Sequence, residues 1–229
     1  MREIVFDTET TGIEPAQGDR IVEIGAVELI GHVATGRTFH EYINPERSMP
    51  DEAFAVHGLG DEFLRDKPLF REVGPKFLKF IGDAKLVAHN ASFDMKFMNA
   101  EFGWMGLPPL PADRAVDTLA IARRRFPGSP ASLDALCRRF GIDNSGRTLH
   151  GALLDSEILA EVYLELIGGR QPDFGLTGQQ SRNSGTTTGN WRPSTRPRPL
   201  PSRVSKAEAE AHDAFVARLG ESALWKSFD

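Results

Sequence analysis

The amino-acid sequence predicts an α/β fold, a mixed five-stranded sheet flanked by helices, with a flexible C-terminal extension. Three observations support this prediction. Strand patterns with short connections come first along the chain, and segments of helical spacing alternate with strand patterns after them. A stretch rich in Pro, Gly, Ser and Arg then follows. An antiparallel group that precedes strand–helix alternation is typical of a mixed sheet with helices on both faces.

The first three predicted strands form an antiparallel meander. Residues 4–6 are apolar on both faces, as expected for a central strand that is covered on both sides. Residues 21–30 and 37–43 follow as strands, and Gly31 and Gly36 are expected to bound the turn between them. The connections are short, which favours antiparallel pairing.

Helices alternate with strands in the next part of the chain. Helical spacing of apolar residues starts at Val73, and residues 85–88 form the next predicted strand. We expect Ser92 to cap a helix that runs towards Trp104, and residues 115–116 to form a short fifth strand. Three more helices are predicted, over residues 118–125, 133–140 and 151–167.

The composition narrows the possible classes of protein. Of the 229 residues, 40% are hydrophobic and 26% charged, as is ordinary for a soluble globular chain. No segment approaches the roughly 20 apolar residues of a membrane helix, and no signal peptide is expected, so we predict a cytoplasmic protein without a membrane partner. The single cysteine, Cys137, excludes an internal disulfide and any site with two cysteine ligands. The net charge of −5 argues against a protein held on DNA by a large basic surface.

The chain is predicted to have three parts. Residues 1–170 are long enough to form a core of their own. Residues 171–204 include a basic stretch with almost no aliphatic side chains, which predicts a flexible linker, because such a composition buries too little apolar surface to offset the entropy of ordering it. Residues 205–229 are too few to form a separate core.

Two carboxylates are expected at the end of the central strand. Side chains alternate between faces along a strand, so Asp7 and Glu9 share one face and lie about 7 Å apart. They repel each other unless a positive group lies between them, and a divalent cation or a buried arginine would serve. Asp155 lies in the apolar seam of the helix predicted over residues 151–167 and also needs a partner, either a metal ion or a core arginine.

For three other polar residues, a structural role and a role in a site are both considered. Asp94 lies in the first turn of a predicted helix, where it could simply complement the helix dipole. Asp117 is expected to cap the helix over residues 118–125. His150 precedes Asp155 by five residues, so it faces the same site only if it lies before the helix, and Gly151 permits that break.

Three motifs, in this order, resemble those of the DEDDh family of 3′→5′ exonucleases, which have a ribonuclease-H-like fold. They are FDTETTG at residues 6–12, AHNASFD at residues 88–94 and HGALLD at residues 150–155. The family's other branch has a tyrosine four residues before the last aspartate, where this chain has Gly151, so the histidine branch is indicated. The resemblance covers residues 1–170. It implies four metal ligands, Asp7, Glu9, Asp94 and Asp155, and a general base, His150.

The same resemblance implies how the site works. Four carboxylates make an oxygen-rich site suited to Mg²⁺ or Mn²⁺. Two such ions would lie about 3.5–4 Å apart. Asp7 would bridge both, and His150 would accept a proton from the attacking water. Glu9 and Asp155 would complete one coordination shell, and Asp94 would reach the other ion mainly through water. The residues implied around the terminal nucleotide are Asp7, Glu9, Thr10, Glu52, His57 and Asp155.

The C-terminal segment indicates a docking role. Within the family, the chain most resembles proofreading subunits of a bacterial replicative DNA polymerase. Ser205 and Glu208 predict a capping box that opens a helix. Beyond them, Phe215, Leu219 and Trp225 are apolar without a core to join, which predicts a segment that binds the polymerase subunit.

Other partners follow from the same resemblance. The substrate would be the 3′ end of single-stranded DNA. Gln171, Phe174 and Leu176 weakly resemble a peptide that binds a sliding clamp, a short pattern that also arises by chance. A small accessory subunit is a further expected partner.

Two alternative functions stay open at this point. The chain could trim RNA or act in DNA repair without a replicase, although a free-standing enzyme has no evident need of a docking segment. It could also be a non-catalytic scaffold between polymerase and clamp, although all five catalytic positions that match the family are filled.

Overall fold

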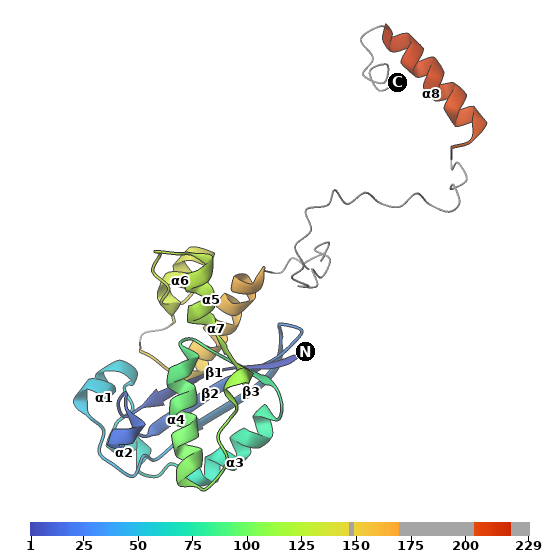
Figure 1. Ribbon diagram of the computed structural model, residues 1–229. Helices are drawn as coiled ribbons and strands as arrows, with labels where there is room; N and C mark the ends of the chain where they lie inside the picture. The colour runs from blue at the N-terminus through green and yellow to red at the C-terminus, as the bar shows by residue number, and fades with distance from the viewer. Residues whose placement is uncertain (147–148, 170–203, 221–229) are drawn as a thin grey trace, which may run out of the picture. The chain divides into compact units, whose positions relative to one another are not determined.

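The computed structural model describes residues 1–146, 149–169 and 204–220, which belong to two units (Figure 1). The first unit, Met1–Leu176, holds the sheet and seven α-helices among its described residues. The second unit, Thr177–Asp229, contains one described helix, α8 (Lys206–Leu219). In the part of the chain that is described, no helix is long and apolar enough to cross a membrane.

The sheet has five strands in the order β3-β2-β1-β4-β5, so β1 is central as predicted. β1 pairs antiparallel with β2, which pairs antiparallel with β3, whereas β4 is parallel to both β1 and β5. The mixed sheet and its meander are therefore confirmed. The strand bounds are β1 (Arg2–Thr10), β2 (Ile21–Ile30), β3 (Val33–Tyr42), β4 (Lys85–Ala88) and β5 (Ala115–Asp117).

The turn between β2 and β3 is tighter than predicted. β3 begins at Val33, so the expectation that Gly36 bounds this turn is wrong. Gly36 lies inside the strand at a φ of 81°. The β2–β3 register shifts between Val27 and Leu29, and an irregular ladder of this kind accommodates a glycine with positive φ.

Helices cover both faces of the sheet (Figure 1). One face packs against α3 (Phe70–Ile81) and α4 (Ala91–Trp104), and Ile4 and Phe6 of β1 point into this part of the core. The other face takes Val5 and packs against three helices, α5 (Thr118–Arg125), α6 (Leu133–Phe140) and α7 (Ala152–Ile167). Two short helices, α1 (Asp51–His57) and α2 (Asp61–Leu64), were not predicted.

The start of α4 differs from the prediction. Asn90, not Ser92, is the N-cap residue, and its backbone is left-handed with a φ of 68°. β4 leads into α4 with only two residues between them, and asparagine adopts the left-handed conformation that such a sharp turn needs more readily than other side chains. Ser92 lies within the first turn, where its hydroxyl donates to Oδ1 of Asn90 over 3.2 Å.

Two predicted helix caps are confirmed. The Asp117 carboxylate accepts hydrogen bonds from the N–H groups of Leu119 and Ala120 at the start of α5. In the second unit, Ser205 and Glu208 form the predicted capping box of α8.

Candidate active site

The site forms at the carboxyl end of β1. Asp7 is partly buried and Glu9 is 7% exposed, and both project from the face of the sheet that α7 covers. Asp7 lies opposite Gly25 of β2 in the antiparallel ladder. The central position of β1 therefore brings these carboxylates beneath the start of α7.

Gly25 allows α7 to approach the sheet closely. A Cβ atom at this position would lie 2.1 Å from the backbone of Ala152 and of Leu153, a distance that real Cβ atoms do not adopt. The Ser156 hydroxyl lies 2.9 Å from the carbonyl oxygen of Gly25 and 2.7 Å from that of Ala152, and it can donate to either. The first turn of α7 is thus held against β2, beside Asp7.

Asp155 and His150 meet at this end of α7. Asp155 is 3% exposed, and its Oδ2 lies 3.3 Å from Nδ1 of the exposed His150 ring. His150 precedes the helix, with Gly151 as the N-cap residue, which is the arrangement that a shared site requires. The backbone N–H of His150 donates to the carbonyl of Val56 over 3.1 Å, so α1 anchors the loop before α7.

Glu9, His150 and Asp155 form a group that fits a metal ion. Each offers one ligand atom, and these atoms all lie within 4.8 Å of one another. Two carboxylates and an imidazole are ordinary ligands of divalent cations. Two carboxylates held this close in a buried setting repel each other, and a bound cation relieves that repulsion.

Asp94 reaches the same end of the sheet from α4. Asp94 is 2% exposed, and its carboxylate accepts a hydrogen bond of 2.7 Å from the Thr8 hydroxyl. Thr8 lies between Asp7 and Glu9 in the chain. Burial raises the pKa of Asp94 to about 7, against the opposite effect of the Thr8 hydrogen bond. Asp7 and Asp94 are not members of the three-residue group defined above.

The remaining predicted substrate residues lie on or near α1 and the end of β1. Glu52 is exposed in the first turn of α1. The Thr10 hydroxyl donates to the carbonyl of Gly12 over 2.6 Å. His57 is 5% exposed, and its Nδ1 accepts a hydrogen bond from the N–H of Leu59 over 3.0 Å. Burial lowers the pKa of His57, which favours a neutral ring.

Three site features escaped the sequence analysis. Gly25, Ser156 and the α1 carbonyl of Val56 position the ligand-bearing segments without holding a ligand themselves. An isolated glycine within a strand pattern is a known sign of a close backbone approach, so Gly25 could have been flagged. The other two contacts depend on long-range packing.

The structure describes only some of the residues predicted to bind the polymerase subunit and the clamp. Phe215 is 57% exposed and Leu219 is 44% exposed on α8. Trp225, Gln171, Phe174 and Leu176 lie outside the described residues.

Comparisons with known proteins identify the family of this chain. A family model described as Exonuclease matches residues 4–163. DNA polymerase III subunit epsilon of Rickettsia conorii is 49% identical over 226 residues, which cover 97% of this chain and 98% of that protein. The Escherichia coli K12 protein of the same name is 45% identical over 239 residues, covering 99% and 98%.

Solved structures share the fold. Exonuclease X in complex with 5′ overhanging duplex DNA is 30% identical, with a TM-score of 0.57, and the match covers 72% of this chain and 90% of that one. The nuclease domain of 3′hExo, a DEDDh family member bound to rAMP, has a TM-score of 0.60 at 22% identity, covering 72% and 91%. The second likeness concerns the fold alone.

Proposed function

This chain belongs to the exonuclease family and, within it, to the DNA polymerase III epsilon subunits, and we propose that it removes mismatched nucleotides from DNA 3′ ends as a subunit of the replicative polymerase. The observation that carries the proposal is the convergence of Glu9, His150 and Asp155 at the start of α7. These residues come from segments more than 140 positions apart, and all lie in the motifs that mark the DEDDh family.

Four carboxylates would hold the metal ions of the reaction. We assign this role to Asp7, Glu9, Asp94 and Asp155, with Mg²⁺ or Mn²⁺ as the ions, because the donor set is rich in oxygen. Two bound ions would stabilise the attacking and leaving oxygens of an in-line displacement at phosphorus.

His150 would act as the general base. A proton on Nδ1, directed towards Oδ2 of Asp155 at 3.3 Å, leaves Nε2 as the basic nitrogen. The half-exposed ring has room to accept a proton from water and to pass it to solvent. Asp155 thereby has a second effect, which is to fix the tautomer and orientation of the base.

The terminal nucleotide would lie between β1 and α1. Thr10, Glu52 and His57 border this region, together with the carboxylates of the site. The buried His57 ring is anchored through Nδ1 to the Leu59 N–H, so it is a fixed wall rather than a mobile ligand.

Residues 205–229 would bind the alpha subunit of DNA polymerase III through Phe215, Leu219 and Trp225. In support, α8 exposes Phe215 and Leu219 and is well capped at Ser205. Residues 171–204 would then be a tether for the nuclease domain of residues 1–170, with Gln171, Phe174 and Leu176 contacting the sliding clamp. A small accessory subunit is a further proposed partner, and the assembly would work in the cytoplasm.

A pull-down tests the docking assignment. Removal of residues 206–229 should abolish capture of the alpha subunit and leave hydrolysis of free single strands unchanged. Capture that survives the truncation would refute the assignment, and a truncated protein that loses hydrolysis would show that the tail serves the nuclease itself.

The catalytic assignment is tested with primers that carry paired or mismatched 3′ ends, in the presence of Mg²⁺ or chelator. Asp155→Asn should abolish hydrolysis, whereas Glu157→Gln, an exposed substitution on the same helix, should not change it. Hydrolysis of a matching RNA strand in the same assay distinguishes proofreading from RNA trimming. Equal rates for Asp155→Asn and the unsubstituted chain would sink the proposal.

A further inference from the structure

Helices α5 and α6 carry a concentration of positive charge within a negative unit. Residues 1–169 contain 18 lysines and arginines against 26 acidic residues, whereas residues 118–140 contain five arginines and only Asp134. All five arginines are exposed. We call them the α5–α6 arginine face: Arg123, Arg124, Arg125, Arg138 and Arg139.

The charges of this face are not neutralised by carboxylates. Across residues 1–146 and 149–169, none of the five arginines forms an ion pair with a described acidic side chain. Arg2, Arg20 and Arg47, by contrast, each lie within 2.8 Å of a carboxylate oxygen. Arginines in the last turn of a helix favour its C-terminus, but that effect leaves their guanidinium groups available to an external anion.

Part of the face is held in place by an aromatic ring. The Arg139 guanidinium lies 4.3 Å from the centroid of the Phe126 ring, and that of Arg125 lies 5.6 Å from the same ring. Arg125 also donates from Nη1 to the carbonyls of Glu165 and Leu166 at the end of α7. The ends of α5, α6 and α7 are therefore tied together, and Arg123, Arg124 and Arg138 project from a fixed support.

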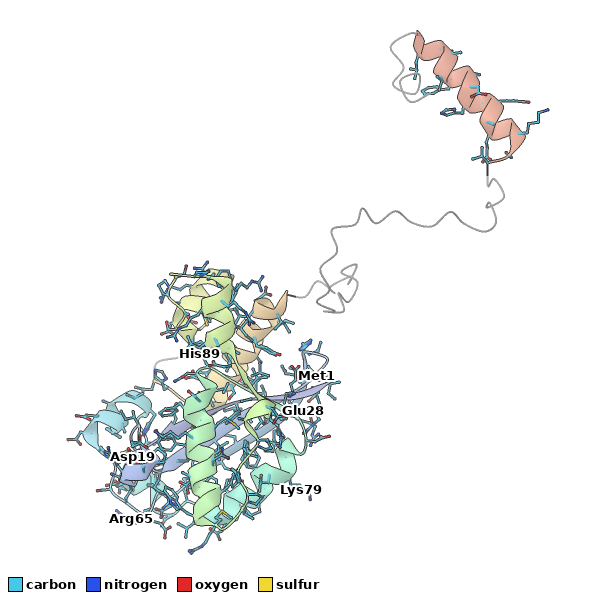
Figure 2. All side chains as sticks on the ribbon, in the orientation of Figure 1. Met1, Asp19, Glu28, Arg65, Lys79 and His89 are labelled. Carbon is cyan, nitrogen blue, oxygen red and sulfur yellow. The ribbon has the colours of Figure 1, made fainter. Side chains whose placement is uncertain are left out.

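Helix α5, which carries three of these arginines in its last turn, begins beside the candidate active site. Asp117 caps α5 and accepts a hydrogen bond of 3.1 Å from the N–H of Asn90, at the start of the helix that carries Asp94. Nδ1 of His89 lies 2.9 Å from the Thr118 hydroxyl, and Figure 2 labels His89 where α4 and α5 approach each other. Burial lowers the pKa of His89, and the positive charge of Arg123 adds to the effect.

We propose that the α5–α6 arginine face binds the phosphates of the substrate strand on the 5′ side of the nucleotide being removed. The inference rests on the proposed function, since it takes a nucleic-acid strand as the substrate. The carboxylates of the site repel the phosphates of an entering strand, and cations along its path offset that repulsion. Arginine suits this role because its planar guanidinium can donate two hydrogen bonds to one phosphate.

The test compares two triple variants of the full chain with the same change in charge. The test variant combines Arg123→Gln, Arg124→Gln and Arg138→Gln, which spares the two arginines on Phe126. The control variant combines Arg65→Gln, Arg71→Gln and Lys79→Gln, three exposed cations elsewhere in the unit. Figure 2 labels Arg65 and Lys79 on the side of this unit away from α5 and α6.

Two measurements are made on each protein. Binding of a labelled single-stranded oligonucleotide is followed in chelator at several salt concentrations, and hydrolysis of the p-nitrophenyl ester of thymidine monophosphate is followed with Mn²⁺. The test variant should bind the oligonucleotide roughly tenfold more weakly, with a salt dependence shallower by about 2 in the log–log slope, because about 0.7 is lost per single-strand phosphate contact. Hydrolysis of the ester, which has no upstream phosphate, should be unchanged.

Other outcomes decide against the proposal. Unchanged oligonucleotide affinity in the test variant, or an equal loss in the control variant, would overturn it. Unchanged DNA binding together with a loss of polymerase capture in the pull-down would also overturn it. That result would identify the face as a protein interface. If the glutamine variant fails to fold, a triple lysine variant at the same positions must retain the salt slope. Failure of the unsubstituted chain to hydrolyse the ester would instead overturn the proposed function.

Discussion

The buried carboxylates at the two ends of β1 have opposite surroundings. Glu3 and Glu9 lie on the same face of the same strand, and α7 passes over both ends. At the Glu3 end, the Tyr163 hydroxyl donates to Oε1 over 2.8 Å, and Nδ1 of His32 lies 2.7 Å from Oε2. At the Glu9 end, the neighbours include another carboxylate, that of Asp155.

The difference separates a carboxylate with a structural role from one that we propose to bind a metal ion. Glu3 is fully buried, the Tyr163 hydroxyl donates to its Oε1, and the His32 ring lies beside its Oε2 without forming a hydrogen bond to it. Burial and the hydrogen bond to Glu3 raise the pKa of Tyr163 above its usual value, so this phenol stays a donor. The Glu9 end brings like charges together instead, which is expected where a cation completes the site.

Glu9→Gln gives the largest expected effect on this comparison. Loss of one carboxylate from the group should lower exonuclease activity by roughly a thousandfold or more. The free energy of unfolding should not fall, because repulsion with Asp155 is relieved. Primer hydrolysis and denaturant unfolding measure the two quantities, and activity close to that of the unsubstituted chain would remove Glu9 from the site.

Gly25→Ala should disturb the candidate active site at the Glu9 end of β1, because it displaces the backbone of α7. The added Cβ meets the backbone of Ala152 and Leu153, so α7 must move away from β2. A displacement of about 1 Å at Asp155 should lower kcat on the order of a hundredfold. Gly103→Ala, near the end of α4, is the control, because a Cβ there meets nothing within 4 Å. Equal kcat values for both variants would show that the close approach does not position the site.

Glu3→Gln tests the structural end. The amide can still accept a hydrogen bond from Tyr163, but the pairing with His32 loses its charge, so the free energy of unfolding should fall by about 1–3 kcal/mol. Exonuclease activity of the folded protein should stay the same. Chemical denaturation with a parallel activity assay checks both expectations, and a loss of kcat without a loss of stability would contradict the division between the ends.

Asp94→Asn should have a smaller effect, a change in thermal stability that depends on pH, measured in the presence of chelator. Burial raises the pKa of Asp94 to about 7, so the folded protein keeps this proton where the unfolded chain has released it. Stability from this group is therefore present at low pH and is lost as the pH rises through about 7. The asparagine variant should melt at a higher temperature than the unsubstituted chain at pH above this value. Near the ordinary pKa of aspartate the two should melt alike, and a difference that does not depend on pH would contradict this account.

Much of the architecture could be predicted from local patterns. Helices α5 and α6 begin and end at the predicted residues, because strong caps and clear apolar spacing define them. The position of Asp155 in a buried seam followed from helical periodicity alone. The roles of Asp7, Glu9, Asp94 and His150 rested on resemblance, since spacing alone left arginine, helix-dipole and metal readings open.

The parts that were missed depend on contacts between distant segments. α1 ends with Val56 and His57, whose surroundings include the His150 loop, and its exposed Phe54 gave no amphipathic signal. The left-handed cap at Asn90 depends on the tight exit from β4. Gly25 has its meaning only against Ala152, more than 120 residues later in the chain.

The most direct test of the account is calorimetric titration of Mn²⁺ into the unsubstituted chain, Glu9→Gln and Glu3→Gln. We predict that the unsubstituted chain and Glu3→Gln bind the ion alike and that Glu9→Gln loses most of this binding. Equal binding by all three proteins, or none by the unsubstituted chain, would contradict a metal centre at the carboxyl end of β1.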